Sequence, residues 1–367
     1  MRRVAPRAIG AGLLAAAALG AALRQNDQER DGRRATEHRP AADVLRLPDL
    51  VEPTFAVDAA LVLEFDATPN RLAVLDAMNA RVLVLRAGLS GWRPELAFGQ
   101  RGDGPGEMRS PHGIAFTGDG GIVVADEARL HFFTASGAYV RSTQPQTSCQ
   151  LQRPGVAGGR NVVFLHGTCV RRDSATAQLY WTADGESFVP LATDLRYTLD
   201  GQFGSMLGSI SPFSEGDGRH VFGVGNTNCL YDVRDDGVRP HVMLVCELAA
   251  GRYRSPAPAA LQERLRREGA RRPEFRRLLR WPEVLPVYVE MLAVGEQTVL
   301  VRPFSPDSVV FEMVGARREV LVAPYKGFVG CRRYGCLWTD HTADSVRLTL
   351  LRRERVAEIV ASQGRGL

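Results

Sequence analysis

Apolar residues occur along most of this chain in short runs that are separated by glycine, aspartate and asparagine. Short runs of Val, Ile, Leu and Phe between turn-forming residues predict many β-strands rather than long helices. The pattern begins near Leu47 and continues almost to the C-terminus. We therefore expect one all-β domain over residues 47–354, followed by a C-terminal tail at residues 355–367.

The strand pattern repeats. The segment "RLAVLDAMNARVLVLRAG", residues 71–88, aligns with "GIVVADEARLHFFTASG", residues 121–137: an apolar strand ends at an aspartate, a polar turn reaches an arginine, and a second strand follows. Weaker copies of this strand-turn-strand core begin at Asn161, His220, Gln297 and Gly335. Strand candidates between the cores, such as "YVRST", "HVMLVCELA" and "REVLVAP", leave room for about four strands in each unit. This repeat predicts a six-bladed β-propeller of four-stranded antiparallel blades.

Two segments modify that prediction. Residues 256–282 carry apolar side chains at helical spacing, with Pro273 between two short stretches, which predicts a helical insert between the fourth and fifth blades. A strand near Val44 to Val57 is expected to join the last blade, because this closes the ring and covers a free sheet edge.

The N-terminus has the layout of a secretory signal peptide at residues 1–23. Arg2, Arg3 and Arg7 precede an apolar run from Ala8 to Leu23, which is shorter than the roughly 20 residues that span a bilayer. Residues 24–46 are polar and without periodicity, which is typical of a disordered linker. We expect an exported protein, periplasmic or secreted, with no membrane span after cleavage; a retained N-terminal anchor is the alternative.

Six cysteines in an exported chain favour disulfides. Cys331 and Cys336 enclose four residues at a strand-turn-strand position, which suits a bridge across a hairpin. Cys229 with Cys246 and Cys149 with Cys169 complete a sequential scheme, although other connectivities exist for the remaining four cysteines. Metal binding is the alternative for Cys331 and Cys336, but no second pair at zinc spacing accompanies them.

The formal net charge is +5, but it is unevenly distributed. Ten arginines and three glutamates lie between Arg252 and Arg280, and three more arginines lie in the leader, so the rest of the chain is acidic. Lys326 is the only lysine, so arginine is the general basic residue of this chain. A group of arginines therefore does not by itself indicate a binding patch. We expect no nucleic-acid partner.

One stretch resembles a known family. "FGQRGDGPGEMRSPHGIAFTGDGGIVVADEARLHFFTASGAYVRS", residues 98–142, is similar to the NHL repeat of six-bladed propellers, and residues 71–88 match it in part. The order of the C-terminal segments also resembles secreted bacterial six-bladed propellers, mostly of uncharacterised function. The resemblance implies that the first strand of each blade lines a central channel and that ligands approach at the channel mouth.

Four residues are candidates for that mouth. His112 lies where an innermost strand starts, and Asp76, Asp126 and Asp340 end strands at corresponding positions. The three aspartates are also typical of turn-closing residues. By resemblance to a propeller lyase that acts on peptidyl-hydroxyglycine, His112 is an alternative metal ligand. A zinc site needs about three protein ligands, and the other candidates are His131, His166, His220, His241 and His341; of these, His131 is expected to face outward from its strand.

The glycine-rich segment around "RGDGPGE" is interpreted as a connector between blades. A phosphate-binding loop would open a helix and supply a lysine, whereas here Glu107 and a strand follow. The tripeptide Arg101-Gly102-Asp103 spells an adhesion motif that recurs by chance. No Gly-x-Ser-x-Gly nucleophile motif occurs. We expect a monomeric module, without cofactor, that binds a protein, peptide or carbohydrate; the alternative is a metal-dependent lyase or hydrolase with its site at the channel mouth.

Overall fold

The computed structural model describes the chain in segments. These are residues 45–46, 55–59, 61–89, 91–127, 129–145, 150–156, 163–171, 174–182, 186–198, 213–216, 219–223, 229–235, 240–246, 267, 290–295, 297–305, 308–314, 318–324, 326–341 and 345–364. The predicted signal peptide, the linker up to residue 44 and the helical insert apart from Arg267 lie outside them. Within these segments no helix has the length and apolar character needed to cross a membrane.

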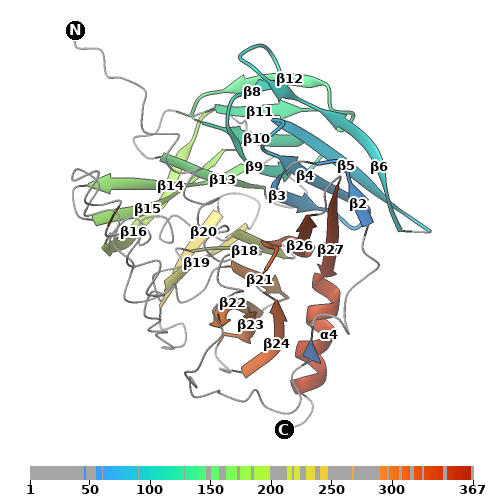
Figure 1. Ribbon diagram of the computed structural model, residues 1–367. Helices are drawn as coiled ribbons and strands as arrows, with labels where there is room; N and C mark the ends of the chain where they lie inside the picture. Colours follow the sequence, from blue (N-terminus) through green and yellow to red (C-terminus); the bar gives the residue numbers. More distant parts are fainter. Residues whose placement is uncertain are drawn as a thin grey trace.

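The described strands form an all-β propeller of mostly antiparallel sheets (Figure 1). Sheet 1 consists of β3 (Val62–Ala67), β4 (Arg71–Asp76), β5 (Arg81–Gly88) and β6 (Gly91–Phe98). Sheet 2 consists of β9 (Pro111–Phe116), β10 (Ile122–Asp126), β11 (Arg129–Phe133) and β12 (Tyr139–Thr143). Sheet 3 consists of β13 (Gln150–Val156), β14 (Val163–Arg171), β15 (Ser174–Thr182) and β16 (Val189–Thr198).

The second half of the chain continues the series. Sheet 4 consists of β17 (Phe213–Gly216), β18 (Arg219–Gly223), β19 (Cys229–Asp235) and β20 (Pro240–Cys246). Sheet 5 has β21 (Glu290–Val294), β22 (Gln297–Ser305), β23 (Ser308–Met313) and β24 (Arg318–Pro324), with β1 (Leu45–Arg46) as a fifth strand. Sheet 6 has β25 (Phe328–Arg332), β26 (Gly335–His341), β27 (Val346–Arg352) and β2 (Phe55–Val57).

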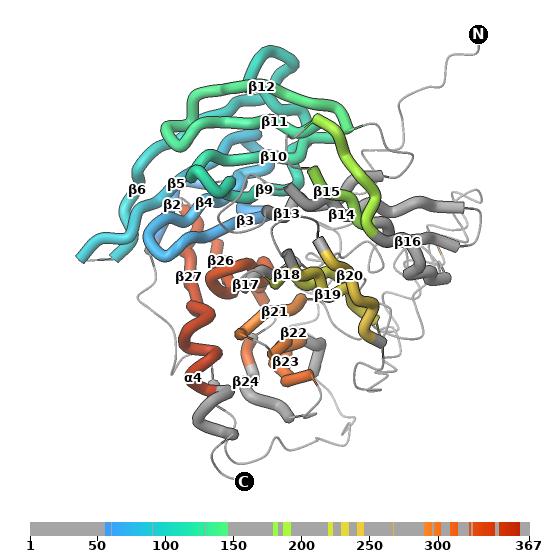
Figure 2. The backbone as a smooth tube through the Cα atoms, turned by 180° about the vertical axis from the view of Figure 1, so that it is seen from behind, coloured from blue at the N-terminus to red at the C-terminus, as the bar shows by residue number. Residues whose placement is uncertain are grey.

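The first strand of each sheet is the inner one, because β3 contacts β9 and β25, β9 contacts β13, and β21 contacts β17 and β25. In Figure 2 the strands β9, β10, β11 and β12 succeed one another from the centre outward. The six repeated cores of the sequence correspond to the second and third strands of the six sheets. The strand assignments within the cores are therefore confirmed. Five sheets have the predicted four strands, and sheet 5 differs because β1 adds to it.

The N-terminal segment, predicted as a strand near Val44 to Val57 in the last blade, forms two strands in neighbouring sheets. β2 pairs with β27 of the last sheet, as predicted. The prediction was wrong for residues 45–46, which were also assigned to the disordered linker: they form β1, which pairs in parallel with β24 of sheet 5. The two strands therefore cover the outer edges of neighbouring sheets, which leaves fewer unpaired backbone groups at those edges.

Apolar side chains fill the spaces between successive sheets rather than one central core. Separate buried clusters lie between sheets 1 and 2, 2 and 3, 4 and 5, 5 and 6, and 6 and 1. Trp338 illustrates this packing: it is buried in sheet 6 and its ring lies 6.5 Å from that of Phe311 in sheet 5. Because successive side chains point to opposite faces of a strand, each sheet contributes apolar side chains to the clusters on both of its sides.

The C-terminal segment, assigned from sequence only as a tail, contains the helix α4 (Arg353–Gly364). Val356 and Ile359, three residues apart on one face, are buried in the cluster between sheets 5 and 6. The helix contacts β21, β24, β26 and β27, and Figure 1 shows it continuing directly from β27. It therefore fills the seam where the last sheet meets the one before it.

Two further elements lie in the glycine-rich connector, residues 99–110. The short strands β7 (Gln100–Arg101) and β8 (Glu107–Met108) pair in parallel as a two-stranded ribbon. The ribbon joins the outer strand of sheet 1 to the inner strand of sheet 2, as expected for a connector between blades. Its position brings the glycine-rich segment to the boundary between the two sheets.

Candidate functional site

Three buried charged side chains meet where the inner strands come together. They are Glu64 of β3, Glu290 of β21 and Arg332 of β25, and their exposed fractions are 1%, 3% and 5%. The three strands belong to sheets 1, 5 and 6. Charges are almost never buried this completely unless they are paired. We call these three residues the central charge cluster.

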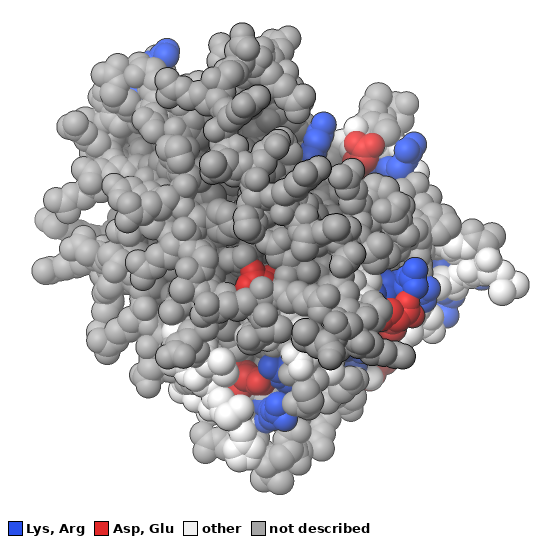
Figure 3. All heavy atoms as spheres, turned by 90° about the horizontal axis from the view of Figure 1, so that it is seen from below, with Lys and Arg blue, Asp and Glu red and all other residues white. Residues whose placement is uncertain are grey.

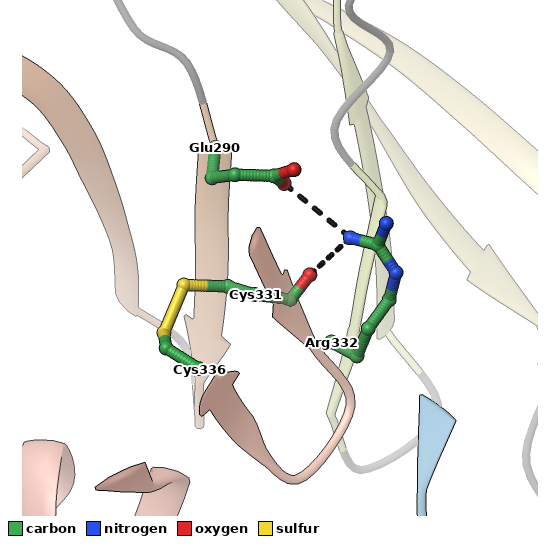
Figure 4. The surroundings of a disulfide bond; sticks show 4 residues. All are labelled: Glu290, Cys331, Arg332 and Cys336. Atoms are coloured by element: carbon green, nitrogen blue, oxygen red, sulfur yellow. Dashed lines mark hydrogen bonds and ion pairs between the residues drawn. A yellow bond between two sulfur atoms is a disulfide. The ribbon is translucent and has the colours of Figure 1, made fainter. Parts of the chain in front are cut away.

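Arg332 holds the central charge cluster together. Its Nη2 donates to Oε1 of Glu64. Its Nη1 lies 3.5 Å from Oε2 of Glu290 and donates to the carbonyl oxygen of Cys331 (Figure 4). Burial by itself would lower the pKa of Arg332, but the carboxylates of Glu64 and Glu290 raise it above the ordinary value of arginine. The guanidinium therefore stays charged and links three inner strands.

Local sequence explains how Arg332 reaches this position. The hairpin of β25 and β26 is closed by a disulfide between Cys331 and Cys336, which lie opposite each other with a Cα–Cα distance of 4.0 Å. A Cβ at Gly330 would lie only 2.7 Å from Oε1 of Glu290, so a glycine leaves room for the carboxylate there. The segment "GCRRYGC" thus encodes a tight hairpin with an arginine beside its bridge.

Asp66 lies on the same strand as Glu64, two residues further along, and is 8% exposed. Its Oδ2 accepts a hydrogen bond from the amide of Phe116 in β9 at 2.7 Å, and its Oδ1 accepts one from the amide of Ala67 at 2.8 Å. Burial raises the pKa of Asp66 to about 6, although both amides and the nearby Arg332 and Arg333 oppose the shift. Asp66 therefore joins the inner strands of sheets 1 and 2 through a carboxyl group whose pKa is raised by its burial.

Asp76 and Asp126, two of the predicted mouth residues, are buried and close turns. Oδ1 of Asp76 accepts the amide of Leu61 at 3.1 Å, and Oδ2 accepts Nε of Arg81 at 3.1 Å. Asp126 likewise accepts amides at the start of β9. Each aspartate thus fixes the beginning of the inner strand of its own sheet. These contacts account for both residues without a ligand.

The other two predicted mouth residues lie in different surroundings. Asp340 is exposed near the end of β26 and lies opposite Arg347 in the strand register, so it does not repeat the buried position of Asp76 and Asp126. His112 is the second residue of β9, an inner strand, as predicted. It is partly buried, and its Nδ1 lies 3.2 Å from the carbonyl oxygen of Ser110. Asp76 thus lies in sheet 1, His112 and Asp126 lie in paired strands of sheet 2, and Asp340 lies in sheet 6.

The histidines named as possible zinc ligands are also distributed over several strands. His131 in β11 and His220 in β18 are buried, while His241 and His341 are exposed; the side chain of His166 lies outside the described residues. Among the residues described, no group of three His, Cys, Asp or Glu side chains gathers around a common point. The expectation that His131 faces outward was wrong: it is 2% exposed and lies beside Asp126, because its face of β11 packs toward sheet 1.

The connector uses its polar groups internally. Glu107 accepts the amide of Gly104 at 2.8 Å and the side-chain amide of Gln100 at 2.6 Å, and a Cβ at Gly102 would lie 2.0 Å from its Oε2. Asp103 pairs with Arg109 and Arg101 donates to two carbonyl oxygens, so both charged members of the Arg-Gly-Asp tripeptide have partners within the protein. The connector is therefore a folded turn around Glu107, which agrees with its interpretation from the sequence as a connector between blades.

Sequence reasoning missed the central charge cluster and Asp66. The available signal was a charged residue inside an apolar run, as in "LVLEFDA" around Glu64 and "VEMLAV" around Glu290. In a strand with one solvated face such residues point to water, so the pattern alone favours the wrong assignment. Their burial follows only from the meeting of the inner strands.

Of the predicted disulfides, Cys331–Cys336 is confirmed. Cys229 is disulfide-bonded and lies opposite Cys246 in the register of β19 and β20, which agrees with the predicted pair. Cys149 lies outside the described residues, so its pairing with Cys169 stays a prediction.

Comparisons with known proteins show no family for this chain. No family model matches the chain, and no curated protein matches it. Similar solved structures include regucalcin from Agrobacterium tumefaciens, described as a calcium-binding protein (10% identity, 81% of this chain and 92% of that one, TM-score 0.44), and a luciferin-regenerating enzyme (7%, 80% and 92%, TM-score 0.45). A chain of a nidogen–laminin complex is also similar (14%, 72% and 80%, TM-score 0.40). These likenesses are too distant to transfer an activity.

Proposed function

We propose that this chain is an exported six-bladed β-propeller, related in design to NHL-repeat propellers, that works as a non-catalytic binding or scaffold module. Support for six blades comes from the six repeated cores and from the five four-stranded sheets plus sheet 5 with its added β1. Support for export comes from the basic and apolar layout of residues 1–23 and from the buried disulfide of sheet 6.

The observation that carries the binding role is a series of exposed apolar side chains on outer strands. Tyr139 and Val140 of β12 are 36% and 54% exposed, Val189 of β16 is 43% exposed, and Met243 and Leu244 of β20 are 52% and 45% exposed. These strands are the outer members of three successive sheets, and β16 contacts β20. Contiguous exposed apolar surface is typical of interaction sites, and we propose that these outer-strand side chains contribute to one.

The described residues on one face include charges of both signs. In Figure 3, coloured basic and acidic side chains lie beside one another in several places. We propose a protein, peptide or carbohydrate ligand that contacts the exposed apolar side chains of the outer strands.

The alternative function is a metal-dependent lyase or hydrolase at the channel mouth. The observation in its favour is that His112 begins an inner strand, where a propeller lyase carries a metal-ligating histidine. Elemental analysis of the purified mature protein separates the two functions. We expect no stoichiometric zinc; zinc near one equivalent that is lost in His112→Ala would establish the alternative.

Binding is tested on peptide and glycan arrays with the mature protein and two variants. We expect Met243→Asp to weaken any peptide binding at least several-fold, because a charge in an apolar contact is costly to desolvate. Met78→Asp is the matched control, because Met78 is 61% exposed in the turn between β4 and β5, away from the outer strands. Equal binding by the wild type and Met243→Asp would show that the outer strands are not the binding surface.

A further inference from the structure

The hairpin of β25 and β26 carries its disulfide in the interior of the protein. Cys331 and Cys336 are both 0% exposed and belong to the apolar cluster between sheets 5 and 6. Beyond the register shift that follows Phe328, the hairpin pairs at three positions: Gly330 with Leu337, Cys331 with Cys336 and Arg332 with Gly335. The bridge joins the middle pair, so it fixes the backbone on both sides of Cys331.

The central charge cluster contacts the same part of the backbone. Nη1 of Arg332 donates to the carbonyl oxygen of Cys331 and lies 3.5 Å from Oε2 of Glu290 (Figure 4). A Cβ at Gly330 would lie 2.7 Å from Oε1 of Glu290, so that carboxylate also lies close to the residue before Cys331. The disulfide and the ion pairs therefore act on the same three residues, 330–332.

We propose that the disulfide and the central charge cluster are coupled through this backbone, so that the oxidation state of the hairpin controls the ion pairs at the centre of the propeller. The bridge keeps Arg332 between Glu64 and Glu290, which lie on the inner strands of sheets 1 and 5. The coupling is reciprocal, because a bridge that favours the ion pairs is favoured by them to the same extent. The ion pairs therefore protect the bridge from reduction.

Reduction separates the two parts by thiol–disulfide exchange with a dithiol. One thiolate of the dithiol attacks a sulfur of the bridge, the S–S bond breaks, and a mixed disulfide forms. The second thiol of the reagent then displaces the cysteine: the protein gains two thiols, and the reagent, which loses two electrons and two protons, becomes a cyclic disulfide. Two non-bonded sulfur atoms need more room than two bonded ones, and a close-packed interior does not provide it. The backbone at Cys331 must then shift, and Arg332 shifts with it.

The burial of the bridge makes the ion pairs a barrier to this reaction. A thiolate in solution reaches the bridge only when the hairpin opens locally, because both cysteines are fully buried. Opening moves Arg332 away from Glu64 and Glu290, and it leaves their buried carboxylates without this cation. A variant that lacks the ion pairs should therefore open more often and be reduced faster.

Reduction of the folded mature protein by dithiothreitol tests the proposal. Samples are quenched by alkylation at intervals, and mass spectrometry follows each cysteine separately. In Arg332→Met we expect the Cys331–Cys336 bridge to be reduced about tenfold faster than in the wild type, which lies within the usual range of coupling between two sites. The disulfide of Cys229 in sheet 4 is the internal reference and should keep its wild-type rate.

A matched variant separates this coupling from a general loss of stability. Arg219→Met removes the cation of the buried Asp232 in sheet 4, but it leaves the central charge cluster in place. We expect it to leave the reduction rate of Cys331–Cys336 close to that of the wild type. If Arg332→Met accelerated the reduction of both disulfides equally, or of neither, the proposal would be overturned.

The reverse measurement covers the case in which Arg332→Met does not fold. In the double variant Cys331→Ala, Cys336→Ala, we expect the guanidinium protons of Arg332 to exchange with water about tenfold faster than in the wild type, as followed by NMR. Equal exchange in the two proteins would show that the bridge does not hold Arg332 and would contradict the coupling. Neither measurement depends on what the propeller binds.

Discussion

Buried and partly buried arginines join neighbouring sheets of this propeller in two different ways. At the centre, Arg332 finds both of its acidic partners, Glu64 and Glu290, on the inner strands of other sheets. Further out, Arg71 and Arg219 each begin the second strand of a sheet and pair with an acid of their own sheet, then reach the next sheet through uncharged groups. We call the latter two the turn clasps.

The clasp at Arg71 connects sheets 1 and 2. Its Nε donates to Oε2 of Glu95 in β6 at 3.0 Å, while Nη1 and Nη2 donate to the carbonyl oxygens of Gly120 and Ala135 at 3.1 and 2.8 Å. The fixed fork of the guanidinium satisfies three acceptors at once. One arginine therefore secures two turns of the neighbouring sheet.

The clasp at Arg219 repeats this design between sheets 4 and 5. Its Nε and Nη2 donate to the carboxylate of Asp232 in β19, and Nη1 donates to the carbonyl oxygen of Gln297 at 3.1 Å. Its Nη2 also donates to the hydroxyl of Thr298 at 2.9 Å. The two clasps have different partners but the same position at the start of a second strand.

The two kinds of arginine differ in how much free energy of unfolding is lost when the arginine is removed. Removing Arg332 leaves two buried carboxylates without this cation, and that penalty is larger than the value of the pair itself. Removing Arg71 leaves carbonyl oxygens near the ends of strands, where water replaces part of the hydrogen bonding, and Glu95 keeps its pair with Arg86. Removing Arg219 also leaves one buried carboxylate, that of Asp232, without this cation. Stability should therefore depend most on the centre.

The largest effect is expected for Arg332→Met. We predict a loss of about 3 to 5 kcal/mol in the free energy of unfolding, because Glu64 and Glu290 lose their cation. Urea denaturation measures it. The control is Arg86→Met, an exposed pair with Glu95, which should cost less than about 1 kcal/mol. Equal losses in the two variants would mean that the central charge cluster contributes no more than a surface pair.

The second prediction distinguishes the inner strands from the turn clasps by the pH dependence of the free energy of unfolding. The pKa of Asp66 is about 6 in the folded protein and below 4 when unfolded, so the folded state binds the extra proton between these values. Stability from this group is present below pH 4 and is lost as the pH rises through 6, by roughly 3 kcal/mol at most.

Asp66→Asn tests that pH dependence. The free energy of unfolding of the wild type minus that of the variant should decrease between about pH 4 and 7. Arg71→Met, measured in the same series, should keep the wild-type slope because it leaves Asp66 in place. A constant difference between wild type and Asp66→Asn would show that Asp66 does not titrate in this range.

The smallest effect is expected at the clasps. Arg71→Met should cost about 2 kcal/mol, the value of charged hydrogen bonds at a partly buried site. Arg219→Met should cost somewhat more, about 3 kcal/mol, because the buried carboxylate of Asp232 loses this cation. Because the named partners of the two arginines differ, the double variant should lose the sum within about 0.5 kcal/mol. Thermal and urea unfolding of the four proteins measures this. Clear non-additivity would mean that the seams between sheets act together.

Local features were predictable because they depend on neighbours in sequence. The alternation of apolar residues identified the strands, the Cys-x4-Cys spacing identified the hairpin bridge, and the strand-ending Asp76 and Asp126 were recognised as possible turn-closing residues. Asp340 did not follow them, because the strand pattern cannot tell which end positions become buried. The burial of His131 was missed because the face of a strand depends on the neighbouring sheet.

The sequence by itself thus determined the repeat, the strands within each unit and the turns that connect them, since these follow from side-chain alternation and backbone preferences over a few residues. Only the tertiary structure decided that Glu64 pairs with Arg332 across 268 residues and that Glu290 does so across 42. Closing the ring brings the inner strands together, and no local pattern records which charges then meet away from water.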